Sequence, residues 1–318
     1  MGRYILNRLL ISLFIVFVVS VFSFSLMHIL PGDPARIVLG EDATEEDVQA
    51  LRVKMNLDKP LVKQYVLWIS GMFKGDFGDS IVYRAPVKQV IAERLPKTLA
   101  IGIPALIVSI SVGIAFGVVC ATKRGSVIDQ ILTFISTLGI GTPQFWIGIL
   151  CIFLFAVRLG ILPMKGFVSP AVSFGDYIKH AILPIFCSSL PMIASIARQT
   201  RSNMLDVINQ DYIRTARANG LKNRSIVFKH ALRNTLIPII TIAAMQVRNV
   251  LGGSIIVERV FSIAGLGMLL NEAVSNRDYL IVETCVLMIS LVTVICNLLV
   301  DILYGVVNPQ IRLSGGHR

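Results

Sequence analysis

The sequence is poor in charge: Asp, Glu, Lys and Arg make up 15% of its 318 residues, whereas soluble domains carry about 25%. It also lacks the signatures of common catalytic sites. It contains no HExxH pair of metal ligands and no GxxxxGK[ST] phosphate loop. Neither an intramembrane zinc protease nor a chain that hydrolyses ATP itself is therefore indicated. The sequence predicts a non-catalytic chain that binds no cofactor.

Cysteine and histidine are scarce as well, and their spacing does not indicate a metal site. The five cysteines lie in apolar stretches and form no CxxC pair, so neither a disulfide framework nor a zinc centre is indicated. We interpret them as small hydrophobic residues buried in the membrane. The histidines are scattered without the spacing of paired metal ligands: His28, His180, His230 and His317.

Long apolar runs are what the sequence has in abundance. Hydrophobic residues make up 54% of the chain, and the mean hydropathy is +0.73. A run of roughly 18 or more residues with few charges can cross the ~30 Å hydrocarbon core as a helix, whereas core helices of soluble proteins usually show caps and a polar face. The chain is therefore predicted to be an all-α integral membrane protein with six transmembrane helices, at residues 9–32, 98–122, 130–157, 181–197, 235–257 and 279–304.

The first apolar run resembles a secretion signal only at its start. Arg3 and Arg8 precede it, but the run continues to about Leu30, which is longer than the usual signal core of about 7–15 residues. No small-x-small cleavage site precedes the Pro31-Gly32-Asp33-Pro34 break. We predict that this run is a retained first span.

The distribution of basic residues predicts the orientation. With the N-terminus inside, the cytoplasmic segments hold fourteen Lys and Arg residues and the two short outside loops hold five. Basic residues in short loops favour the cytoplasmic side, and loops longer than about 60 residues do not contribute to this rule. Both termini are therefore predicted to be cytoplasmic. The net charge of +11 is explained by this topology, and nucleic-acid binding is not needed to account for it.

The long segment 33–97 is predicted to be a small folded region outside the membrane. Thr44 precedes three acidic residues, which is typical of a helix start, and an amphipathic stretch follows at Leu61–Phe73. A further helix is expected near Pro86–Leu95. Two interpretations remain open: the segment meets a partner or seals the pore mouth, or it packs on the bundle with Tyr65 and Trp68 at headgroup level.

The loop 198–234 is the most informative polar segment. It carries eight Lys and Arg residues against two acids, Asp206 and Asp211. Residues 211–220 are predicted to form a helix that begins at Asp211, where the helix dipole favours an anion, and ends at Gly220. Residues 221–232 are expected to form a second helix. The pattern indicates either a rigid projecting element or a basic loop that lies on anionic lipid headgroups.

Several motifs together resemble one family. The run Asp211-Tyr212-Ile213-Arg214-Thr215-Ala216-Arg217-Ala218-Asn219-Gly220-Leu221, followed by His230-Ala231-Leu232-Arg233-Asn234 and Pro238, resembles the cytoplasmic signature of ATP-binding-cassette importer permeases. The branch that it resembles most is the peptide, glutathione and nickel branch. Three other stretches support the resemblance: Pro31-Gly32-Asp33-Pro34, Gly265-Leu266-Gly267 with Arg277-Asp278-Tyr279, and Asp301-Ile302-Leu303-Tyr304 with Asn308-Pro309.

The resemblance implies a type I importer permease fold and a coupling helix that fits a groove on an ATPase subunit. The broad family begins this stretch with Glu-Ala-Ala, where this chain has Arg214, Thr215 and Ala216; we interpret that departure as a feature of the branch. Small residues allow close approach, and a charged residue can pair with carboxylates on the ATPase. The coupling residues implied are Asp211, Tyr212, Arg214, Thr215, Ala216, Arg217, Ala218, Gly220, Leu221, His230, Arg233, Asn234 and Pro238.

A charge inside the fifth apolar run is a candidate for the translocation path. Charged residues within spans usually face a cavity or the bundle interior. The candidate residues are Arg248, Asn249, Gly252 and Gly253, on a helix that the resemblance implies lines the path. Two interpretations of Arg248 remain open: it meets the carboxylate of a passing peptide, or it pairs with another subunit or extends towards the headgroups.

The resemblance also implies the assembly and its location. A second homologous permease, forming a heterodimer, two cytoplasmic ATPase subunits that bind ATP and Mg, and an extracytoplasmic binding protein are expected partners in a bacterial inner membrane. The predicted organisation is residues 1–32 as the first span, 33–97 outside, 98–308 as the core and 309–318 as a tail. Peptides are the expected cargo; the alternatives are nickel chelates or glutathione, or a passive channel or structural subunit.

Overall fold

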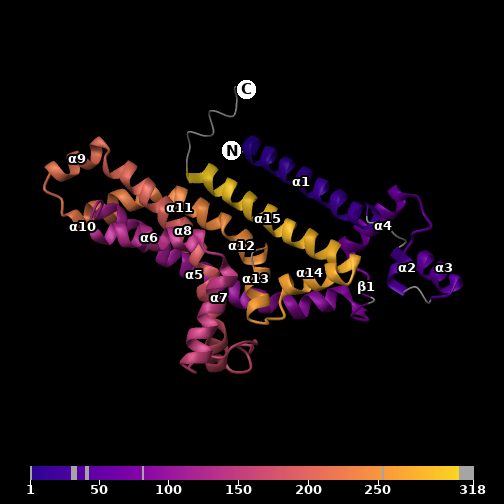
Figure 1. Cartoon of the computed structure of the whole chain (residues 1–318). Coiled ribbons are helices and arrows are strands. Elements are labelled where there is room, and N and C mark those ends of the chain that lie inside the picture. The colour runs from indigo at the N-terminus through magenta and orange to yellow at the C-terminus, as the bar shows by residue number, and fades with distance from the viewer. Residues whose placement is uncertain (1, 30–33, 40–42, 81, 253, 308–318) are drawn as a thin grey trace.

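The computed structural model describes residues 2–29, 34–39, 43–80, 82–252 and 254–307. The chain is almost entirely helical (Figure 1). The expected Pro31-Gly32-Asp33 break, Gly253, Asn308-Pro309 and the tail 309–318 lie outside the described residues.

Four helices among the described residues are long and apolar enough to cross a membrane. They are α1 (Gly2–Ile29), α5 (Val87–Thr122), α8 (Phe174–Ile208) and α15 (Tyr279–Val307). Two bent helix pairs raise the number to six if each pair is one span. The all-α membrane fold is therefore confirmed, and six is the upper value of the span count.

The first bent pair lies where the third span was expected, at residues 130–157. Helix α6 (Val127–Gly141) ends before Thr142-Pro143, and α7 (Gln144–Cys151) continues into the π-helical segment η1 (Ile152–Arg158). The bend between α6 and the joined α7–η1 helix is 106°. Pro143 cannot donate a backbone hydrogen bond and disfavours the helical conformation of the residue before it. The chain therefore bends at Pro143.

The second bent pair occupies the region of the fifth span. It consists of α10 (Asn223–Ser225), the π-helical η2 (Ile226–Leu232), α11 (Arg233–Met245) and α12 (Val247–Gly252), with a 55° bend near Pro238. Helices α13 (Ser254–Val260) and α14 (Leu266–Ser275) follow and lead into α15. The fifth apolar run is therefore a series of short helices.

The segment after α1 folds as predicted in its first part. Helix α2 (Pro34–Leu39) is followed by α3 (Glu45–Lys54), where the Thr44 hydroxyl caps the start by accepting from the Asp47 N–H at 3.2 Å. The amphipathic α4 (Leu61–Lys74) comes next, and a two-residue antiparallel pair joins β1 (Asp79–Ser80) to β2 (Ala85–Pro86). The helix expected near Pro86–Leu95 is the beginning of α5, which runs on without interruption through Pro96.

Helices α5 and α8 form the centre of the packing. Gly113 and Gly117 of α5 approach α8 so closely that a Cβ at Gly117 would lie 2.4 Å from the Thr200 Cβ. Small residues at a spacing of four let membrane helices pack backbone against backbone. Helices α1 and α15 lie side by side along one edge, and α9 (Asp211–Ala218) lies at the opposite end of the molecule from α2 and α3 (Figure 1).

Candidate functional site

Helix α9 is closed at its C-terminal end by a hydrogen-bonded glycine turn. Gly220 has φ +77° and donates its N–H to the Arg217 carbonyl at 3.0 Å, and Leu221 donates to the Ala216 carbonyl at 3.2 Å. These two bonds form a Schellman motif, which needs a left-handed residue where glycine carries no Cβ penalty. The predicted helix from Asp211 to a glycine stop is therefore present.

One face of α9 is anchored and the other is exposed. Ile213 and Ala216 are buried against Ile226 of η2. The exposed face carries Asp211, Tyr212, Arg214, Thr215, Arg217 and Ala218. The Arg214 and Asp211 side chains lie 3.3 Å apart, but both are largely exposed, and such surface pairs contribute little stability. The charged groups of this face are thus accessible to a partner.

The returning arm of the loop fixes α9 in place. The Asn234 amide donates to the Tyr212 hydroxyl at 2.7 Å, which joins the end of the loop to the first turn of α9. Val227 and Ala231 pack with Met204 of α8 in a second apolar cluster. Together with Ile226, these contacts make α9 a supported projection.

The second helix of the loop differs from the prediction in its start and its type. It begins at Asn223, and residues 226–232 are π-helical. Leu221 is exposed in the connection, His230 is partly buried and Arg233 is exposed. Pro238 lies within α11, near the 55° bend. Single π-helical turns often occur at functional sites.

An ion pair that the sequence analysis missed braces the root of this loop. The Arg201 guanidinium of α8 donates through Nε and Nη2 to the two carboxylate oxygens of Asp129, each at 2.9 Å. Asp129 also accepts from the Gly125 N–H at 3.0 Å. The pair joins the first turn of α6 to α8. The signal available in the sequence was an acidic residue, Asp129, directly before the apolar run 130–157. Its partner Arg201 lies 72 residues away, so the sequence did not indicate the pair.

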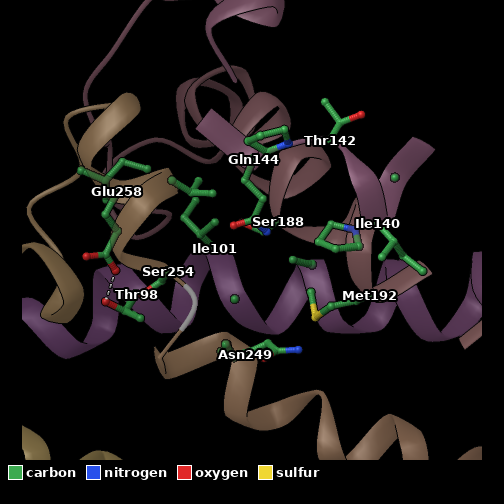
Figure 2. A pocket seen from close by; sticks show the side chains of 18 residues that line it. Thr98, Ile101, Ile140, Thr142, Gln144, Ser188, Met192, Asn249, Ser254 and Glu258 are labelled. Atoms are coloured by element: carbon green, nitrogen blue, oxygen red, sulfur yellow. Dashed lines mark hydrogen bonds between the residues drawn. The ribbon is translucent and has the colours of Figure 1, made fainter. Parts of the chain in front are cut away.

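A cavity of about 370 Å³ lies where the bend between α6 and α7 meets α5, α8, α12 and α13. Figure 2 shows Gln144, Ser188 and Asn249 around it, together with the apolar Ile101 and Met192. The mixture of polar and apolar walls is typical of small-molecule sites. Of these five residues only Asn249 was predicted from the sequence, because the cavity is formed by six separate helices.

Glu258 lines the same cavity, but its carboxylate is engaged in the fold. One oxygen accepts from the Thr98 hydroxyl at 2.6 Å, and the other accepts from the Met268 N–H at 2.8 Å (Figure 2 shows the bond to Thr98). Thr98 in turn accepts from the Leu266 N–H at 2.7 Å. An anion at the first turn of α14 is favoured by the helix dipole. Glu258, which the sequence analysis missed, holds α5, α13 and α14 together.

Of the predicted path residues that the structure describes, only Asn249 lines this cavity. Asn249 lines it and donates to the Gln246 side-chain oxygen at 2.6 Å. Arg248 is exposed on α12 next to Asn249, but it is not one of the lining residues. A Cβ at Gly252 would meet open space. The structure therefore brings Asn249 to the cavity wall and leaves Arg248 beside it.

A second cavity of about 490 Å³ continues towards the α9 end. It lies between α5, α6 and α8 and shares Ile140 with the first cavity. Its walls carry the basic side chains Arg124, Arg198 and Arg201. The two cavities lie in series along one side of α8, from the bend at Thr142-Pro143 to the base of the 198–234 loop.

Comparison with known proteins identifies the class. Residues 113–313 match the model of the binding-protein-dependent transport system inner membrane component, and residues 1–102 match the N-terminal model of the same transport systems. The chain therefore belongs to this family of importer permeases. The resemblance on the loop 198–234 is confirmed at the level of the family.

Individual relatives extend over nearly the whole chain. It is 39% identical over 312 residues to a probable peptide ABC transporter permease of Sinorhizobium fredii, with 98% of this chain and 100% of the relative covered. It is 40% identical to the oligopeptide transport permease AppB of Bacillus subtilis, with the same coverage. It is 40% identical to the glutathione transport permease GsiC of Escherichia coli, with 98% and 99% covered.

The fold resembles a solved importer. A structure of the inward-facing MetNI methionine ABC transporter aligns with a TM-score of 0.55 at 18% identity, covering 69% of this chain and 97% of the other. At this identity the likeness concerns the fold alone. It confirms the expected permease architecture.

Proposed function

We propose that this chain is the permease subunit of an ATP-driven importer of peptides that works by alternating access. The observation that carries the proposal is α9: a short helix fixed by buried Ile213 and Ala216, closed at Gly220, and exposing charged groups at one end of the molecule. Such an element can transmit a rigid-body movement, because its base is joined to α8 and η2. Its partner is an ATPase subunit that binds ATP and Mg and carries out the hydrolysis.

The topology supports this assignment. Basic residues gather at the α9 end, and the rule for short loops favours the cytoplasm for that end. Both chain termini and α9 then lie in the cytoplasm of a bacterial cell, and α2–α4 lie outside, where a binding protein delivers the cargo. Exposed apolar side chains such as Phe14 and Phe22 on α1 leave surface for lipid and for a second permease.

Peptide cargo follows from the relatives. Peptide and oligopeptide permeases align over essentially the whole chain. Glutathione is the second candidate, because the glutathione permease is equally similar to this chain. Glutathione is itself a small peptide. Uptake of labelled dipeptides, oligopeptides and glutathione by cells that express the complete importer separates these cargoes, and the cargo of the cognate binding protein decides between them.

The coupling role is tested at Gly220. Proline fixes φ near −65°, so Gly220→Pro removes the left-handed turn that ends α9. We expect the assembled importer to lose the increase in ATP hydrolysis on addition of the binding protein, and to lose uptake. The matched control is Gly160→Pro, which strains another left-handed glycine, φ +64°, outside the loop. Coupled transport that survives Gly220→Pro contradicts the proposal.

Direct contact is tested by cross-linking. Arg217 is exposed on α9, and Phe73 is 89% exposed on α4 at the other end. Arg217→Cys is expected to cross-link to the ATPase, and Phe73→Cys is the negative control. A passive channel or structural subunit shows neither this cross-link nor stimulated hydrolysis.

A further inference from the structure

A third cavity, of about 360 Å³, lies at the α2–α4 end of the molecule, away from the two cavities along α8. Helices α1, α3, α4 and α15 and the turn at residues 76–79 form its walls. Its lining includes the aromatic side chains of Phe24, Trp68 and Phe77 and the carboxylate of Glu283. Neither the coupling loop nor the path proposed above uses these residues.

Glu283 is the unusual group in this cavity. Its side chain is 1% exposed, and Oε1 has no hydrogen-bond partner among the residues that the structure describes. Trp68 lies in the wall of the same cavity. A buried acid with an unpaired oxygen is costly unless a cation or a donor satisfies it. The free oxygen therefore marks a place for a donor that carries positive charge.

The walls around Glu283 are fixed in place. The Ser23 hydroxyl donates to the Glu283 carbonyl at 3.0 Å, which ties α1 to α15. The Ser20 and Tyr65 hydroxyls lie 2.7 Å apart, which ties α1 to α4. Glu283 is thus held against α1 and α4 by bonds that do not use its carboxylate, and a ligand can bind without reorganising the helices.

Aromatic rings complete the arrangement. The Phe24 and Trp68 ring centroids are 5.8 Å apart, and both rings line the cavity. Aromatic faces attract cations, with indole the most effective. Asp76 and Asp79 also line this cavity, together with one basic residue, Lys54. The Lys54 Nζ lies 4.0 Å from the Asp79 carboxylate. The balance of charge in the cavity favours a cation over an anion.

We propose that this cavity binds a primary ammonium group, with Glu283 as its counter-ion and Trp68 and Phe24 as its aromatic walls. Two sources carry this chemistry: the ethanolamine headgroup of a phospholipid and a soluble primary amine. Helix α4 forms one wall of the cavity. It exposes Leu61, Val62 and Val66, and an exposed apolar face is typical of a helix at the membrane surface. The cavity therefore opens near headgroup level, where both sources have access.

Trp68 serves as the reporter. The chain has two tryptophans, and Trp146→Phe removes the other one, which is exposed on α7. The full chain with this substitution is placed in nanodiscs of phosphatidylglycerol and titrated with ethanolamine or with ethylene glycol, its neutral counterpart. We expect saturable changes in Trp68 fluorescence with ethanolamine alone. An equal response to ethylene glycol overturns the proposal without the need for any variant in the cavity.

The carboxylate is tested by Glu283→Gln, with Glu46→Gln on the exposed face of α3 as the matched control. Loss of a charge-assisted hydrogen bond corresponds to about tenfold weaker binding or more. We expect that loss for Glu283→Gln and unchanged binding for Glu46→Gln. Equal ethanolamine binding by Glu283→Gln and the parent chain overturns the proposal.

A change of lipid distinguishes the two sources of the ammonium group, the phospholipid headgroup and a soluble amine. In nanodiscs of phosphatidylethanolamine with the same acyl chains, a lipid headgroup that fills the cavity raises the ethanolamine concentration needed for half-saturation. An unchanged titration assigns the site to a soluble amine instead. Both results support an ammonium site, and the ethylene glycol and Glu283→Gln arms remain the ones that can reject it.

Discussion

The two carboxylate oxygens of Asp129 each lie 2.9 Å from a guanidinium nitrogen of Arg201. Two parallel hydrogen bonds between a guanidinium and a carboxylate add geometric specificity as well as energy. The Asp129–Arg201 pair joins the first turn of α6 to the part of α8 that begins the 198–234 loop. The ion pair therefore ties the base of the 198–234 loop to the bent pair α6–α7, which lines the central cavity.

Asp129→Asn is expected to destabilise the chain and weaken coupling. It leaves the Arg201 charge with a neutral partner, and breaking a buried ion pair costs roughly 3–5 kcal/mol. We expect about 3 kcal/mol, because the Arg201 side chain is 32% exposed. Thermal unfolding of the purified chain measures the loss. Arg198→Gln, at an exposed arginine one turn earlier, is the control and is expected to unfold like the parent.

Gly117→Ala is expected to separate α5 from α8. The added Cβ lies 2.4 Å from the Thr200 Cβ and 2.7 Å from the Ala197 carbonyl oxygen, so one helix must shift. Such overpacking costs about 1–3 kcal/mol. The matched control is Gly141→Ala, whose Cβ meets no atom within 4 Å. Equal thermal stability of the two variants contradicts the close packing of α5 on α8.

Tyr83 gives a prediction for alkaline pH. Its hydroxyl donates to Glu272 at 2.7 Å, and burial, followed by that bond and the Glu272 charge, raises the pKa of Tyr83 from 10.0 to about 12. Between these values the unfolded chain loses this proton and the folded chain keeps it. The stability contributed by Tyr83 is thus complete below pH 10 and is lost as pH rises towards 12.

Tyr83→Phe is expected to abolish that alkaline loss. It removes the ionisable hydroxyl and keeps the ring, which lies 5.9 Å from the Arg94 guanidinium. Ultraviolet titration of tyrosinate in the parent and the variant isolates the Tyr83 step. A difference spectrum that titrates near pH 10 contradicts the raised pKa.

Features that depend on residues close together in the chain were predicted correctly from the sequence. The α9 helix from Asp211 to Gly220 and the Thr44 cap of α3 depend on neighbouring residues, and both are present. The pairs that organise the site could not be predicted. Thr98 and Glu258 are 160 residues apart, and Asp129 and Arg201 are 72 apart. One sequence without relatives contains no signal that joins such positions.

Some predicted helix boundaries differ from those in the structure for a related reason. Charged Glu93, Arg94 and Lys97 suggested that the outer helix and the second span are separate, yet α5 continues through them. Arg94 lies 3.8 Å from Glu272 of α14, so this charged part of α5 is stabilised by a partner outside the apolar run. Conversely, the apolar run 130–157 predicted a span, but the sequence does not show which prolines bend a helix, and the 106° bend at Pro143 was not predicted.

Arg248 is expected to select peptides with a free C-terminal carboxylate. It is exposed on α12 beside Asn249, which lines the central cavity, and charged side chains within spans usually serve a path or a partner. Arg248→Gln is expected to lower uptake of peptides with a free C-terminus by about tenfold, the factor of one charge-assisted hydrogen bond. Uptake of the same peptides with an amidated C-terminus is expected to change little, because they carry no carboxylate. Arg259→Gln, at an exposed arginine of α13, is the control. An equal loss for free and amidated peptides assigns Arg248 to packing against another subunit or to the headgroup region.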